Sequence, residues 1–135
     1  MIRGHPPYVA IDEAARKARS WGLIALVLGP GQNPPFHFIL CEKPCVSFVR
    51  VRRLKYPRFA PAEIAVSCRR DIAEIRAMDI PQEIFRELWV RGSNRQWHRY
   101  LILADAIEEL DGFDDDNQDP KVEEVSASSA LNLFW

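Results

Sequence analysis

The sequence lacks the segments that direct a chain into or across a membrane. No basic start leads into a long apolar run, as a signal peptide requires, and the longest apolar run, residues 23–28, is too short to cross a bilayer. Cysteine is scarce, since Cys41, Cys45 and Cys68 are odd in number and have no paired framework. We therefore expect a cytoplasmic protein without membrane contact, whose reduced thiols pack as small apolar residues.

Several motifs of catalysis and metal binding are also missing. The sequence has no glycine-rich phosphate loop, no nucleophile elbow and no HExxH stretch. Its 3 cysteines and 3 histidines do not have zinc-finger spacing. These absences exclude the function classes that depend on those motifs, and they predict no zinc site.

Charge is divided unevenly along a chain of otherwise ordinary composition. Its 135 residues, 47% of them hydrophobic, suffice for one domain with a short appendage. Residues 1–104 hold 17 Lys and Arg against 9 Asp and Glu, whereas residues 105–135 hold 1 Lys against 10 acids. This asymmetry predicts a body that binds polyanions and an acidic tail; a solvated surface with a solubilising tail is the alternative.

Apolar periodicity and turn residues predict the element order αβββαββ, followed by a tail. We expect helices over residues 11–20 and 61–77, and strands over residues 23–28, 36–41, 45–53, 85–91 and 96–103. The strand at 23–28 is continuously apolar, which indicates burial on both faces.

The remaining chain divides at Asp111. Few residues from 111 to 129 are able to form a core, so we expect disorder there, with a domain over 1–110 and an acidic tail over 111–135. Within the domain, Trp89 and Trp97 are expected to pack in the core. The alternation of Trp97 with Arg99, and of His98 with Tyr100, offers base stacking or phosphate contact as the alternative.

A stretch of about 40% of the chain, residues 11–53, carries a family pattern. It consists of the first helix, Ser20-Trp21-Gly22, the apolar strand, the Gly29-Pro30-Gly31 loop and the next two strands. This pattern resembles the PD-(D/E)XK (restriction-endonuclease-like) superfamily, most closely archaeal Holliday-junction resolvases. The resemblance implies an α/β fold with a mixed sheet flanked by helices, and a role in DNA repair or replication.

In that family a helix Glu, a strand Asp and a Glu-x-Lys hold Mg²⁺, which activates water for phosphodiester hydrolysis. The resemblance places Glu13 at the helix acid, His37 at the Asp, and Arg50 and Arg52 at the Glu-x-Lys. Two of the three carboxylates are therefore replaced, and cations in their place disfavour Mg²⁺. The resemblance implies a nuclease fold without nuclease chemistry and without a cofactor. The enzyme alternative is a Mg²⁺-dependent, structure-specific nuclease that uses Glu13 with acids such as Glu42, Glu63 or Glu87.

The arginines at these positions suggest phosphate contact instead. Strand alternation puts Arg50 and Arg52 on one face, and Arg53, Lys55 and Arg58 continue the basic run. Guanidinium groups suit bidentate phosphate contact, so we expect these five residues to bind DNA or RNA. The alternative is a structural one, in which Arg50 and Arg52 pair with acids such as Glu13 or Glu87.

The last eight residues form an apolar hook, Ser128-Ser129-Ala130-Leu131-Asn132-Leu133-Phe134-Trp135. It resembles the sliding-clamp (PCNA) interacting peptide, which Leu131, Phe134 and Trp135 match in type and spacing, although Ser128 stands in place of Gln. One helical turn would bring these apolar side chains together to fill a pocket on the clamp. Docking on the chain's own domain, or no role at all, are the alternatives.

Three further expectations concern interactions. The acidic tail is expected to compete with nucleic acid for the basic body, because the two carry opposite charge. A third possible function is that of a protein-interaction module, in which the body binds another protein and the surface charge is incidental. Pairing of two copies of the chain stays open.

Overall fold

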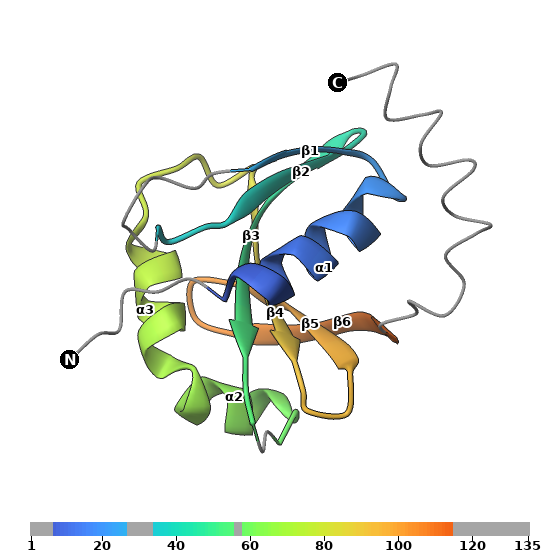
Figure 1. Ribbon diagram of the computed structural model, residues 1–135. Coiled ribbons are helices and arrows are strands. Elements are labelled where there is room, and N and C mark those ends of the chain that lie inside the picture. Colours follow the sequence, from blue (N-terminus) through green and yellow to red (C-terminus); the bar gives the residue numbers. More distant parts are fainter. Residues whose placement is uncertain (1–6, 27–33, 56–57, 115–135) are drawn as a thin grey trace, which may run out of the picture.

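The fold is seen in a computed structural model that describes residues 7–26, 34–55 and 58–114 (Figure 1). Its elements are α1 (Tyr8–Arg19), β1 (Leu23–Leu26), β2 (Phe38–Glu42), β3 (Cys45–Arg53), α2 (Pro61–Ser67), α3 (Arg69–Ala77), β4 (Phe85–Arg91), β5 (Gln96–Ile102) and β6 (Ile107–Asp114). Six strands make one mixed sheet in the order β1-β2-β3-β4-β5-β6. Only β3 and β4 pair in parallel, because α2 and α3 cross between them. The α/β class expected from the sequence is confirmed.

Helices cover both faces of the sheet, so the described chain has three layers (Figure 1). The α1 layer is built on alanines, including Ala14 and Ala18, which let the helix lie close to Val49, Val51 and Trp89. The α2–α3 layer packs on the alternate residues of the same strands. They include Leu88, Val90 and Tyr100. Within the described residues, no helix is long and apolar enough to cross a membrane.

The long helix expected over residues 61–77 is two helices. It begins at Pro61 as expected, but Cys68 takes φ −113° and ψ 27° and separates α2 from α3. Ile64, Cys68 and Ile75 all remain buried across this bend. Because of this turn, both short helices keep their apolar faces on the twisted sheet. One straight helix of the same length would lose contact with the sheet at one of its ends.

The strand expected to be buried on both faces lies at the edge of the sheet. β1 pairs only with β2, so Ile24 packs under α1 while Leu23 is 44% exposed. Residues 27 and 28, the end of the expected strand, lie outside the described residues. The cysteine expectation also needs correction, because Cys68 is buried but Cys41 and Cys45, at the β2–β3 turn, are exposed.

Strand β6 replaces the start of the expected disordered tail. It pairs with β5 through Asp114, so the boundary expected at residue 111 falls inside the sheet. Phe113 holds β6 in place: it stacks on Trp97 at 5.5 Å between ring centroids and contacts Trp21 edge-on. A Cβ at Gly112 would lie 2.1 Å from the Trp97 carbonyl oxygen, so this approach requires glycine. Residues 115–129 lie outside the described residues.

The position of β6 also changes how charge is divided between the domain and the tail. Five of the ten acids in residues 105–135 lie at or before Asp114, in the β5–β6 turn and in β6. The described residues therefore carry 16 Lys and Arg against 14 Asp and Glu. The net charge of the described domain is therefore much closer to zero than that of residues 1–104. A surface that binds polyanions would have to depend on the local clustering of cations and not on the net charge.

Candidate nucleic-acid interface

Alternation along β3 determines where the predicted arginines lie. Val49 and Val51 face α1, so Arg50 and Arg52 face the α2–α3 layer. Arg50 is only 6% exposed. Its guanidinium donates to the carbonyl oxygens of Pro34 and Pro35 at 3.2 Å, and it forms ion pairs on its other sides.

Asp71, in the first turn of α3, is the centre of these ion pairs. Its carboxylate is 2% exposed and accepts hydrogen bonds from Arg50 Nε at 2.7 Å and from Arg52 Nη1. Glu74, one turn later and half exposed, lies 3.1 Å from Arg50 Nη1. We refer to Arg50, Arg52, Asp71 and Glu74 as the Asp71 network. It joins β3 to α3 through two cations and two carboxylates that compensate one another, of which Arg50 and Asp71 are buried.

His37 lies against this network, just before β2. Its backbone N–H donates to the Val49 carbonyl, and its ring Nδ1 accepts a 2.9 Å hydrogen bond from the Val51 N–H. Burial, and then the neighbouring Arg50 charge, lower the pKa of His37 to about 4. The imidazole is therefore neutral at pH 7 and acts as a backbone acceptor, continuing the β2–β3 hydrogen bonding. Burial, with Asp71 second, likewise raises the pKa of the adjacent Cys68 thiol to about 11.

Glu13 lies on the opposite face of the sheet. On α1 it pairs with Arg91 of β4 at 2.8 Å. Glu87 lies on this face too and accepts hydrogen bonds from Arg99 at 3.1 Å and from the Trp89 indole at 2.7 Å. The structure thus brings His37, Arg50 and Arg52 together but leaves Glu13 apart. The arginines do pair with acids, and those acids are Asp71 and Glu74 instead of Glu13 or Glu87.

The donor set at these positions does not fit Mg²⁺. Two guanidinium groups and a neutral imidazole occupy the place where the resemblance requires carboxylates, whereas Mg²⁺ takes oxygen ligands. In the part of the chain that the structure describes, no three His, Cys, Asp or Glu side chains are grouped so as to hold a metal.

Exposed cations lie at the end of β3, just after it and at the start of α3. Alternation along β3 turns Arg53 to the α1 side of the sheet, with Val49 and Val51, and Arg52 to the other side. The Arg52 side chain stays 39% exposed while it contacts Asp71. Arg53 and Lys55 follow at the end of the strand and are exposed, as is Arg70, the neighbour of Asp71. Arg58 is 82% exposed with a long 3.7 Å contact to Glu63. Among the described residues, Arg53 and Arg70 have no acid within ion-pair distance.

The sequence predicted phosphate contact by Arg50, Arg52, Arg53, Lys55 and Arg58, but it did not point to Arg70 or Asp71. Arg70 is exposed. Asp71 precedes Ile72, so a pattern of apolar spacing gives no sign that its carboxylate is buried. Asp71 could have been found from two features together: it lies next to the apolar stripe of its helix, and the strand that this helix covers carries arginines that need an acidic partner.

The aromatic residues of β5 are used inside the domain. Trp97 and Trp89 are 1% and 0% exposed, which confirms core packing. His98 stacks on Phe59 at 3.5 Å between ring centroids, and the Arg99 guanidinium carbon lies 4.8 Å from the centre of the Trp21 ring. These side chains are unavailable for base stacking. The hook residues Leu131, Phe134 and Trp135 lie outside the described residues.

No protein-family model, curated protein or solved structure matches this chain.

Proposed function

We propose that this protein binds the phosphate backbone of DNA or RNA, without catalysing cleavage, through a cationic surface around the end of β3. It consists of Arg52, Arg53, Lys55, Arg58 and Arg70, with Arg53 on the α1 side of the sheet and Arg52 on the other. The observation that carries the proposal is that, among the described residues, the acids near the end of β3 are paired, whereas two of the arginines are not. Asp71 and Glu74 are already engaged by Arg50 and Arg52, while Arg53 and Arg70 have no acidic partner in the part of the chain that the structure describes. Guanidinium groups without a carboxylate partner attract phosphate.

Arg50 has a different role in this proposal from the one its sequence position suggested. It is buried and fully occupied by Asp71, Glu74 and two carbonyl groups, so it positions α3 against β3. Through Asp71 it also fixes Arg52 and the first turn of α3. The phosphate contacts themselves come from the exposed residues around the network.

A degenerate PD-(D/E)XK fold would account for this arrangement. An initial helix, three antiparallel strands, a helical crossover and a parallel strand agree with the expected order. His37, Arg50 and Arg52 meet as the corresponding family positions should, which supports the proposal, whereas the separation of Glu13 counts against a complete site. The clamp-binding hook, and with it a role in DNA repair or replication, rests on the sequence of residues 128–135.

Removing the two unpaired arginines tests the proposed surface. We expect Arg53→Ala/Arg70→Ala to weaken binding of the full chain to duplex and branched DNA by at least tenfold at low salt, as two lost phosphate contacts imply. Fluorescence anisotropy with labelled oligonucleotides measures this. Both side chains are exposed, and neither is in an ion pair with a described residue, so the fold should be unaffected.

The matched control is Arg16→Ala/Lys43→Ala. It also removes two exposed positive charges, from α1 and from the β2–β3 turn, so it matches the change in net charge; Arg16 differs in that it pairs with Asp12 at 3.1 Å. Equal weakening by both double variants would show that only net charge matters, and the proposed surface would be wrong. Absence of any binding by the unmodified chain would favour the protein-interaction alternative.

A further inference from the structure

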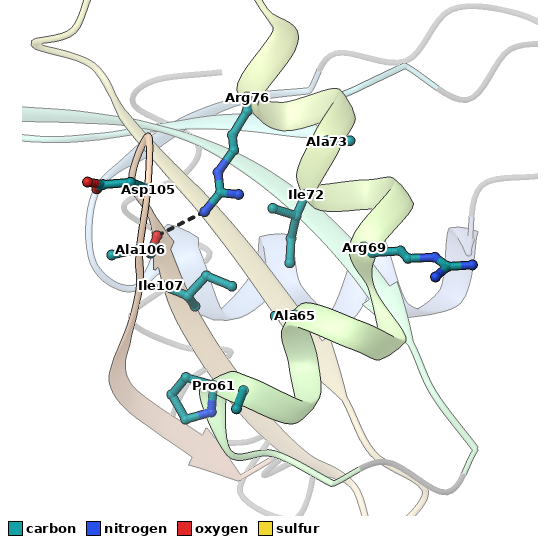
Figure 2. A pocket seen from close by; sticks show the side chains of 10 residues that line it. Pro61, Ala65, Arg69, Ile72, Ala73, Arg76, Asp105, Ala106 and Ile107 are labelled. Carbon is teal, nitrogen blue, oxygen red and sulfur yellow. Dashed lines mark hydrogen bonds between the residues drawn. The ribbon is translucent and has the colours of Figure 1, made fainter.

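A shallow groove lies between the two helices of the crossover and the β5–β6 turn (Figure 2). It has a volume of about 430 Å³ and a floor of small and aliphatic residues, namely Pro61, Ala62, Ala65, Ile72, Ala73, Ala106 and Ile107. Val66, on the same outer arc of α2 as Ala62, is 69% exposed. The groove can take two apolar side chains of ordinary size.

The wall of the groove is fixed in place. Arg76 reaches from α3 to the β5–β6 turn, where its Nε and Nη2 donate to the carbonyl oxygens of Leu103 at 2.8 Å and Ala106 at 3.2 Å. Figure 2 shows this side chain spanning the groove towards Ala106. The groove is therefore formed before anything occupies it, because these hydrogen bonds join its two sides.

The charged residues that line the groove are two arginines, Arg69 and Arg76, and one acid, Asp105. The acids of α2 and α3 are already paired with arginines from outside the helices: Glu63 with Arg58, and Asp71 and Glu74 with the arginines of β3. The helices' own Arg69, Arg70 and Arg76 have no acidic partner among the described residues, and only Asp105 opposes them at the rim. An occupant with apolar side chains and negative charge fits best.

Residues 115–135 of the same chain have this chemistry. They carry 5 acids against Lys121, and they contain the apolar hook residues Leu131, Leu133, Phe134 and Trp135. The groove lies at the Ile107 end of β6, about 24 Å from Asp114 at the rise of a strand. Residues 115–130 extend up to about 55 Å, so the hook reaches the groove without strain.

We propose that the hook docks in this groove on its own domain, with its aromatic pair between α2 and the β5–β6 turn. The acidic residues before the hook then lie near Arg69 and Arg70. Docking would keep the hook from other partners and place acids beside the cationic surface. This inference does not depend on nucleic-acid binding, and its test uses none.

Backbone amide shifts of the full chain test the docking directly. In Leu131→Ala/Phe134→Ala/Trp135→Ala, the amides of Ala65, Ala73 and Ala106 should move, because the aromatic rings leave the groove. The matched control Val122→Ala/Val125→Ala removes apolar groups from the same segment outside the hook, and it should leave those three amides unmoved.

A change on the groove side gives the reciprocal test. Ala73 is exposed on α3, so Ala73→Glu leaves the core intact while it fills the groove and repels the acidic segment. It should move the amides of residues 131–135. Unmoved groove amides in the hook variant would overturn the proposal, as would hook amides that ignore Ala73→Glu. Shifts that depend on protein concentration would also overturn it, because they would show a second copy as the occupant.

Discussion

The most informative perturbation of the domain is Asp71→Asn, which removes one buried charge and keeps the size of the side chain. Asp71 is 2% exposed and accepts from two arginines, one of which, Arg50, is itself 6% exposed. After the substitution the remaining carboxylate beside the Arg50 guanidinium, among the described residues, is the half-exposed Glu74. A buried charge that loses its principal partner costs about 3–5 kcal/mol of unfolding free energy.

Urea denaturation of the full chain, followed by circular dichroism and tryptophan fluorescence, measures this loss. A domain of this size should also melt about 12 °C lower or more. The matched control is Glu74→Gln, which removes a carboxylate from the same arginine. Because the Glu74 side chain is 48% exposed, solvent screens its ion pair and the loss should stay under about 1 kcal/mol.

The pairing itself is tested by replacing both partners with apolar residues. Arg50→Met/Asp71→Leu should be more stable than Asp71→Leu alone, because no unpaired charge remains buried. Asp71→Asn within 1 kcal/mol of the unmodified chain, or no more costly than Glu74→Gln, would refute the reasoning. Either result would mean that the network contributes little to holding α3 on the sheet.

Three further predictions concern other parts of the domain. The pKa of His37 is about 4 in the folded chain, against an ordinary value of 6.5. The neutral, buried imidazole therefore contributes fully to stability above pH 6.5, and this contribution is lost as the pH falls towards 4. Between pH 7 and pH 4.5, urea denaturation should show that the free energy of unfolding falls by up to about 3 kcal/mol more in the unmodified chain than in His37→Asn. Gly112→Ala should cost about 1–3 kcal/mol and expose β6 amides to hydrogen exchange, since its Cβ would meet the Trp97 carbonyl; unchanged exchange would contradict this. Tyr100→Phe should cost about 1 kcal/mol in thermal denaturation, because the Tyr100 hydroxyl donates to the Phe59 carbonyl at 2.6 Å, and a neutral result would refute that contribution.

The best-predicted elements are those whose own residues show a clear apolar pattern or a clear start or turn signal. Strand β3 has the expected bounds, and the hairpin of β4 and β5 and the proline start of α2 are as expected. Strand β6 was missed because its half-buried residues Ile107, Leu110 and Phe113 recur every three residues instead of every two. Ile107 packs on the α2–α3 side of the sheet and Phe113 on the α1 side. A register shift opposite the step from Trp97 to Arg99 adds the extra residue between Leu110 and Phe113, and the sequence of β6 alone does not reveal it.

The candidate site was predicted in part for a similar reason. Strand alternation correctly places Arg50 and Arg52 on one face, but burial separates them, so Arg50 holds the structure while Arg52 remains half exposed. The partner of both, Asp71, is 19 residues or more away in the chain. A tertiary ion pair of this kind leaves no periodic trace in the sequence.

The central claim, phosphate contact by the cationic surface, is tested most directly by the salt dependence of DNA affinity of the full chain. If Arg52, Arg53, Lys55, Arg58 and Arg70 contact five phosphates, the logarithm of the association constant should fall against the logarithm of salt concentration with a slope of about −4.5. Removing Arg53 and Arg70 should reduce that slope by about two fifths, to about −2.7. A flat response of the unmodified chain, or a slope that the double variant leaves unchanged, would contradict the account.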